Sequence, residues 1–104
     1  MSERESELRN LASSGQPGDA IQAVVELTNE FLIPAESYEE AEKLLMEKIG
    51  LQTLREGQIL ELTLGELYIR MGEISRARRF LEGAKTSGVE SVSQRASEQL
   101  QNLQ

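Results

Sequence analysis

A run of four carboxylates is the most chemically suggestive feature of this chain. Glu36, Glu39, Glu40 and Glu42 lie within seven positions, a pattern that could provide an acid/base pair or a divalent-cation site. However, one helix cannot surround a calcium ion with six oxygens. A catalytic carboxylate also needs burial or a close charged partner to shift its pKa. We therefore expect these glutamates to solvate the surface of a helix.

The residues of most other protein catalysts are missing. The 104 residues include no His and no Cys, which excludes a Ser-His-Asp triad, a thiolate nucleophile, a disulfide framework and a cysteine-ligated zinc ion. Lone serines such as Ser87 and Ser91 consequently have no imidazole base. We predict that the protein is not an enzyme and that it needs no cofactor and no metal ion.

The charge of the chain excludes further functions. Eleven basic and eighteen acidic residues give a net charge of −7, which argues against binding to a nucleic-acid backbone. A basic cluster, Arg76, Arg78 and Arg79, could bind phosphate, but Glu73 and Glu82 flank it at helical spacing, and we expect an internally paired, solvated face.

The sequence also indicates the compartment of the protein and whether it inserts into a membrane. No apolar run approaches the roughly 20 residues that span a bilayer, so we predict no membrane insertion. Residues 1–9 are charged and contain no apolar secretion signal. Together with the absence of Cys, this predicts a cytoplasmic protein.

The elements that must position any site are helices. Leu, Glu, Gln, Arg and Ala dominate the sequence, and turn signals containing Gly or Pro recur between apolar stripes of helical period. Asp19 and Ser37 are candidate helix caps. The pattern predicts an all-α fold with about six helices, near residues 3–13, 19–32, 35–49, 56–71, 74–86 and 91–103.

The fourth and fifth of these helices carry a repeat signature. It consists of Leu64, Gly65, Tyr68, Gly72, Ile74, Ala77, Leu81 and Ala84. Gly65 and Ala77 are small where two antiparallel helices approach closely, Tyr68 and Leu81 fill the space beside them, and Gly72 allows a tight turn. This spacing resembles the tetratricopeptide repeat, a helical hairpin of about 34 residues.

The resemblance implies a single domain over residues 1–104, built as an α-α superhelix of antiparallel hairpins. The clearest repeat covers residues 58–91, and a capping helix at about 91–103 would cover the exposed apolar side of the last hairpin. The chain departs from the repeat pattern at Glu61, where an aromatic residue is common, and at Val89, where a proline usually closes the repeat. Residues 68–103 are also similar to the C-terminal module of FimV-like proteins, which implies a protein-docking module.

A fainter second copy of the repeat can be placed in two ways. Tyr38, Ala41 and Leu45 match residues 74, 77 and 81, which would pair the second predicted helix with the third. Ala23 and Leu27 also match residues 77 and 81, which would pair the first helix with the second. We favour the first placement, but the sequence leaves both open.

In tetratricopeptide proteins the first helix of each hairpin lines a concave groove that binds a peptide or partner helix. The resemblance assigns to this groove Glu26, Glu30, Ile33, Ile59, Leu62, Glu66, Ile69 and Arg70. Because residues three and four apart share a helix face, these form an apolar strip with carboxylates along it. Such a strip suits a basic or amphipathic helix or peptide with apolar anchors.

We therefore predict a non-catalytic protein–protein interaction module, either an adaptor or a small chaperone-like scaffold. Two alternative functions remain open. The chain could be a self-associating structural module that forms a homodimer, because short repeat arrays are marginally stable alone. It could also be a regulatory subunit of a larger complex.

Overall fold

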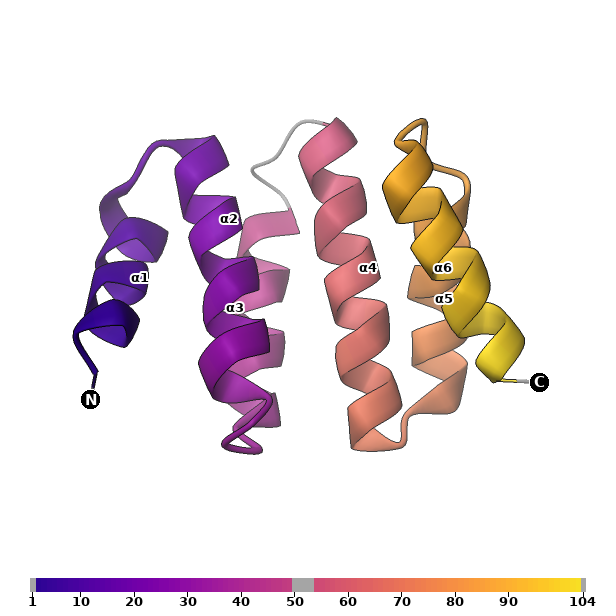
Figure 1. The fold of residues 1–104 in the computed structure, drawn as a ribbon, viewed down its shortest axis with the longest axis horizontal. Helices are drawn as coiled ribbons and strands as arrows, with labels where there is room; N and C mark the ends of the chain where they lie inside the picture. Colours follow the sequence, from indigo (N-terminus) through magenta and orange to yellow (C-terminus); the bar gives the residue numbers. More distant parts are fainter. Residues whose placement is uncertain (1, 50–53, 104) are drawn as a thin grey trace. The chain divides into compact units, whose positions relative to one another are not determined.

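The computed structural model describes residues 2–49 and 54–103, and this part of the chain is all-helical, as predicted. Figure 1 shows its six α-helices, which are α1 (Glu3–Ser14), α2 (Pro17–Leu27), α3 (Tyr38–Ile49), α4 (Leu54–Met71), α5 (Ile74–Lys85) and α6 (Glu90–Asn102). The α2 helix continues into a π-helical turn, η1 (Thr28–Leu32). Residues 50–53, between the third and fourth predicted helices, lie outside the described residues. The chain folds into two compact units, Met1–Gln52 and Thr53–Gln104.

Unit 1 consists of α1, α2 with η1, and α3. Its α1 helix is capped by Ser2, whose Oγ accepts a hydrogen bond from the backbone N–H of Glu5 at 3.0 Å. The α2 helix packs against α1 and against α3. The packing of α2 on α1 is the more extensive of the two, whereas the pairing favoured from the sequence was that of α2 with α3. The buried apolar residues of the unit are Leu8, Ala12, Ala20, Ile21, Ala23, Val24, Leu27, Leu32, Ala41 and Leu45.

Two helix starts in unit 1 differ from the prediction. The predicted cap Asp19 lies in the first turn of α2, and Gln16 occupies the N-cap position instead. The reason is Pro17, which is well suited to a first helical position because it lacks the N–H that would be unsatisfied there. The third helix begins at Tyr38 rather than at residue 35, because Glu36 has a φ of 58° and ends a turn.

The π-helical turn in unit 1 contains a buried polar atom without a partner. The backbone N–H of Ile33 donates to the carbonyl of Thr28 at 2.9 Å, five residues back. Thr28 has no exposed surface, and its Oγ1 has no hydrogen-bond partner in the described structure. A helical threonine can donate to a carbonyl one turn earlier, but Thr28 does not, so its hydroxyl is buried at a cost in stability.

Unit 2 is a tight hairpin of α4 and α5 with α6 packed on it. A Cβ atom on Gly65 would lie 2.7 Å from both Cγ and Cδ2 of Leu81 and 3.4 Å from the carbonyl oxygen of Ala77. The helices therefore approach closely where the small residues predicted it. Gly72, with a φ of 78°, makes the turn between them.

Aromatic and apolar side chains fill the rest of unit 2. The Tyr68 ring stacks on Phe80 with centroids 5.6 Å apart. The α6 helix completes the unit by packing on both α4 and α5. The core cluster there consists of Leu62, Leu81, Ala84, Val92 and Ala96.

Candidate functional site

The α4 strip comprises the predicted groove residues of unit 2, namely Ile59, Leu62, Glu66 and Ile69. Leu62 is 8% exposed and belongs to the core cluster that α6 helps to form. Ile59 and Ile69 are partly buried and pack against the same cluster. Arg70, predicted as a fifth groove residue of this helix, is exposed. The structure thus brings the three apolar residues of the strip together, but in contact with α6.

The carboxylate of the α4 strip is also engaged by α6. The Nε of Arg95 donates to Oε2 of Glu66 at 2.8 Å, and the Nε2 of Gln99 donates to the same oxygen at 3.4 Å. The Glu66 side chain is 19% exposed and that of Arg95 is 61% exposed. The acidic residue of the strip therefore binds a basic side chain of the same chain.

The α4 strip is not open in this structure, because α6 packs on it within unit 2. Two roles were predicted for this surface. The residues of the strip were assigned to an open groove, and the capping helix was also expected to cover the apolar side of the last hairpin. That side is the α4 strip. Burial of Val92 and Ala96 against Leu62 removes apolar surface from water, so α6 occupies the strip within its own unit.

The α2 strip comprises the predicted groove residues of unit 1, namely Glu26, Glu30 and Ile33. Glu26 is engaged by α1, since Nη2 of Arg4 donates to its Oε2 in a short ion pair. Gln22 donates to its other oxygen at 3.4 Å. Glu30 is exposed and Ile33 is partly buried. Because the π-helical turn η1 adds a residue to the helical repeat, these side chains lose the alignment that a 3.6-residue period predicts.

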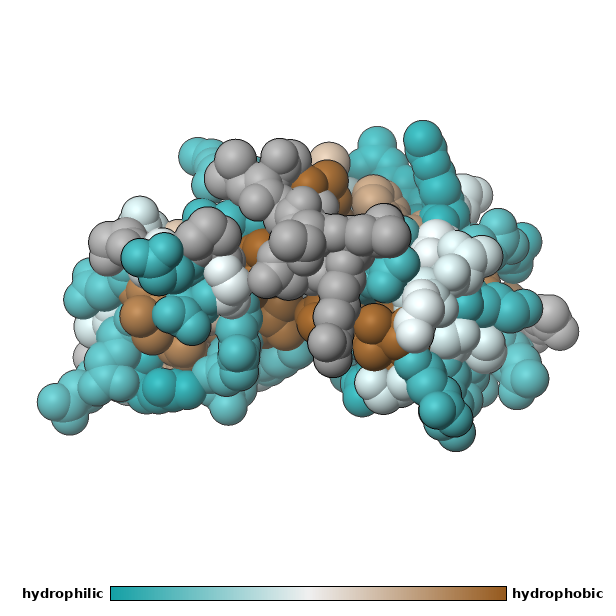
Figure 2. All heavy atoms as spheres, turned by 90° about the horizontal axis from the view of Figure 1, so that it is seen from above, coloured by the Kyte–Doolittle hydropathy of each residue, from teal (hydrophilic) through white to brown (hydrophobic). Residues whose placement is uncertain are grey.

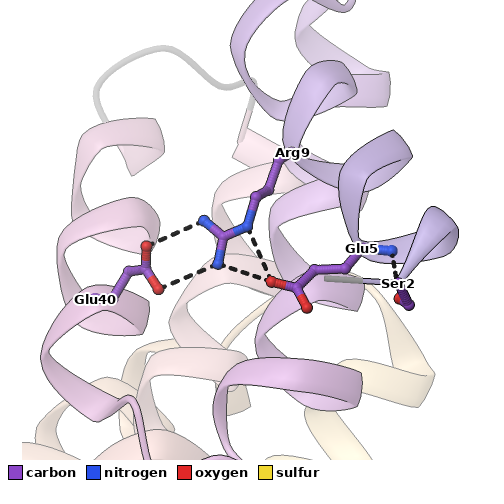
Figure 3. Close-up of polar contacts among 4 residues, drawn as sticks. All are labelled: Ser2, Glu5, Arg9 and Glu40. Carbon is purple, nitrogen blue, oxygen red and sulfur yellow. Dashed lines mark hydrogen bonds and ion pairs between the residues drawn. The ribbon is translucent and has the colours of Figure 1, made fainter.

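One of the four glutamates that were expected only to solvate a helix surface, Glu40, makes a specific contact. Arg9 of α1 lies between Glu5 and Glu40 in Figure 3, with Nη1 and Nη2 donating to the two Glu40 oxygens at 3.1 and 3.3 Å. Its Nε donates to Glu5 at 3.1 Å. The hydrogen bond from Arg9 lowers the pKa of the Glu40 carboxyl. This pair joins α1 to α3 across 31 positions of sequence, and nothing in the spacing of the residues indicated it.

Sequence reasoning also missed an open pocket of about 330 Å³ in unit 1. Apolar side chains from all three helices line it, with polar groups beside them. The lining residues are Arg9, Ala12, Ser13, Leu27, Leu44, Glu47 and Lys48. Arg9 of this lining forms an ion pair with Glu40. Lys48 is the second cationic residue of the lining.

The basic cluster of α5 lies on the surface of unit 2. Arg76, Arg78 and Arg79 are exposed. Arg76 pairs with Glu73 at 4.0 Å, and its guanidinium carbon lies 5.8 Å from the centre of the Tyr68 ring. This residue is therefore partly committed to contacts inside its own unit.

One carboxyl in unit 2 has an unusual environment. The carboxylate of Glu61 lies where a Cβ atom on Gly83 of the facing helix would be. Burial raises the pKa of the Glu61 carboxyl. The missing side chain of Gly83 leaves the space that this carboxyl occupies.

Other kinds of site were sought across the described residues. In residues 2–49 and 54–103, no group of three or more His, Cys, Asp or Glu residues is placed to hold a metal ion. Within the same ranges, no helix combines the length and hydropathy required to cross a bilayer. Comparison of the chain with protein-family models, curated proteins and solved structures finds no match.

Proposed function

We propose that the protein is a non-catalytic protein–protein interaction module, an adaptor or small scaffold of tetratricopeptide-like hairpins that binds a basic amphipathic helix or peptide in the cytoplasm. The observation that supports this proposal is the seating of α6. The α4 strip contacts an amphipathic helix through apolar residues around Leu62 and through an ion pair between Glu66 and Arg95. A surface of this composition is suited to helix recognition.

Unit 1 offers the corresponding acidic group in an accessible form. Glu30 is exposed and forms no ion pair with a described residue, whereas Glu26 is neutralised by Arg4. A partner with Lys or Arg beside apolar anchors would gain orientation and association rate from Glu30. Most of the affinity would come from burial of apolar area, at roughly 25 cal/mol per Å².

A pull-down with matched charge changes tests this proposal. Wild-type protein, Glu30→Lys and Glu39→Lys would each be used to capture partners from lysate. Glu39 is an exposed carboxylate on α3, so its replacement makes the same change in net charge elsewhere in unit 1. We expect a partner to be retained by wild type and Glu39→Lys and lost by Glu30→Lys. Equal retention by all three proteins would contradict a role for the α2 strip.

The self-associating alternative has less support. The exposed residues of α6 are polar, which disfavours apolar packing of this face against a second copy. They are Glu90, Ser91, Gln94, Arg95, Glu98, Gln101 and Asn102. Hydrophilic side chains also dominate the surface seen in Figure 2, where hydrophobic ones show only in small areas. A dilution series by light scattering would detect a homodimer, and we expect a monomer.

A further inference from the structure

The α6 helix matches the chemistry that the α4 strip is expected to bind. Val92, Ala96 and Leu100 recur every four residues on its inner face, and Arg95 lies beside them. Ala96 has no exposed surface, so the strip accepts only a small residue at that point. Arg95 reaches the Glu66 carboxylate. These contacts define a helix with small apolar residues at i and i+4, leucine at i+8 and arginine at i+3.

We propose that α6 is a displaceable occupant of the α4 strip, and that a partner helix with this same pattern takes its place. This inference rests on the proposed function, because it assigns α6 the role of regulating access to a partner-binding surface. The partner is then recognised by the contacts that α6 makes in its absence.

The local structure of α6 favours detachment. Its N-cap residue, Val89, makes no side-chain capping hydrogen bond, and its last turn has no basic residue to interact with the helix dipole. The α2 and α5 helices also lack a side-chain cap, whereas α1 is capped by Ser2. An isolated helix of this length is marginal in water, so the 13 residues of α6 depend on docking for their structure.

The α6 helix packs mainly on α5 and to a lesser extent on α4. Its two buried side chains, Val92 and Ala96, are small. Leu100, with the flanking Val89 and Leu103, is only partly buried against the same cluster. The Arg95 side chain is 61% exposed, and an ion pair so close to solvent contributes little to stability. Elements of this kind open locally at a lower free energy than the core around them.

Thiol labelling measures this opening directly, because the chain contains no cysteine. Ala96→Cys places a thiol under α6, and Ala77→Cys places one in the α4–α5 hairpin. Both alanines have no exposed surface, so each thiol reacts only when its surroundings open. We expect Ala96→Cys to be labelled at least about 100-fold faster than Ala77→Cys in the full chain. Equal rates would show that α6 leaves only on unfolding of the unit and would overturn the proposal.

A peptide binding assay then tests replacement. The probe is a fluorescent synthetic peptide of residues 88–103, measured by anisotropy against the full chain and against its Ala96→Asp variant, in which the aspartate disfavours docking of α6. We expect the peptide to bind the variant at least about 10-fold more tightly than wild type. A control peptide with Arg95→Glu should bind more weakly, because it places a carboxylate beside Glu66.

The outcomes separate this inference from the proposed function. Circular dichroism and the labelling rate of Ala77→Cys in the Ala96→Asp background establish that the α4–α5 hairpin remains folded. With a folded hairpin, failure of the peptide to bind the variant would overturn displacement of α6. The Glu30→Lys pull-down does not depend on α6, so its result would stand separately.

Discussion

Two glycines on facing helices of unit 2 allow the close packing of the hairpin to be tested quantitatively. Gly65 and Gly83 both lie in helix interiors, where replacement of Gly by Ala gains about 1 kcal/mol of helix propensity. At Gly65 a new Cβ would lie 2.7 Å from two carbon atoms of Leu81, a residue with no exposed surface. Overpacking of this kind costs typically about 1–3 kcal/mol. The difference of these two terms predicts that Gly65→Ala lowers the free energy of unfolding by up to about 2 kcal/mol.

Gly83→Ala should have the opposite effect. The new Cβ there would meet only the carboxylate end of Glu61, which is partly exposed and can rotate toward water. We expect the variant to be more stable than wild type by about 0.5–1 kcal/mol, since the gain in helix propensity is retained. Urea denaturation followed by circular dichroism would give both values. A gain in stability for Gly65→Ala equal to that for Gly83→Ala would refute the steric argument, because the two substitutions share every other effect.

Three further substitutions test individual side chains. Burial raises the pKa of Glu61, so its penalty is absent at low pH and grows as pH rises through the raised pKa. Thermal unfolding should show Glu61→Gln with a higher Tm than wild type at pH 7 and the same Tm near pH 3. Arg9 lowers the pKa of Glu40, so the stability from this pair is present at neutral pH and is lost as pH falls through the lowered pKa. Glu40→Gln should therefore cost up to about 1 kcal/mol at pH 7 and nothing at pH 2, and an equal cost at both would argue against the ion pair. Thr28→Val removes a buried hydroxyl without a partner and should raise the urea midpoint by an amount equivalent to about 1 kcal/mol; a lower midpoint would indicate an undetected hydrogen bond.

The parts of the fold that depend on residues close together in the sequence were predictable. Small residues at 65 and 77 indicated a close approach of two helices, and the structure places Gly65 against Leu81. Gly72 indicated the turn that its positive φ provides. The π-helical turn at Thr28–Leu32 was not predicted, because a shift of one residue in hydrogen bonding leaves the apolar pattern nearly unchanged. The start of α3 was misplaced because Glu36 carries no sequence signal for positive φ.

The site was less predictable because its contacts are long-range. The pair between Arg9 and Glu40 and that between Glu66 and Arg95 each join helices distant in sequence. Every exposed carboxylate of an acidic chain is a plausible partner for such an arginine, so spacing within one helix does not select among them. Periodicity identified the apolar face of α4 correctly. It could not distinguish a face that binds a partner from a face that binds the chain's own last helix.

If α6 and a partner compete for the α4 strip, this competition determines which partners the module can bind. An attached helix is present at an effective concentration that a free partner rarely reaches. If the strip is open about 1% of the time, the apparent affinity of every partner is weakened about 100-fold. A partner must therefore bind the strip better than α6 does.

Two features of α6 indicate how a partner helix could bind more tightly. The N-terminus of α6 lacks a side-chain cap, and its buried residues are small. A helix with a capping serine and the same arginine would keep the contact with Glu66 while losing less entropy on binding. Occupancy by α6 would then exclude helices that merely resemble it and admit those that are better formed.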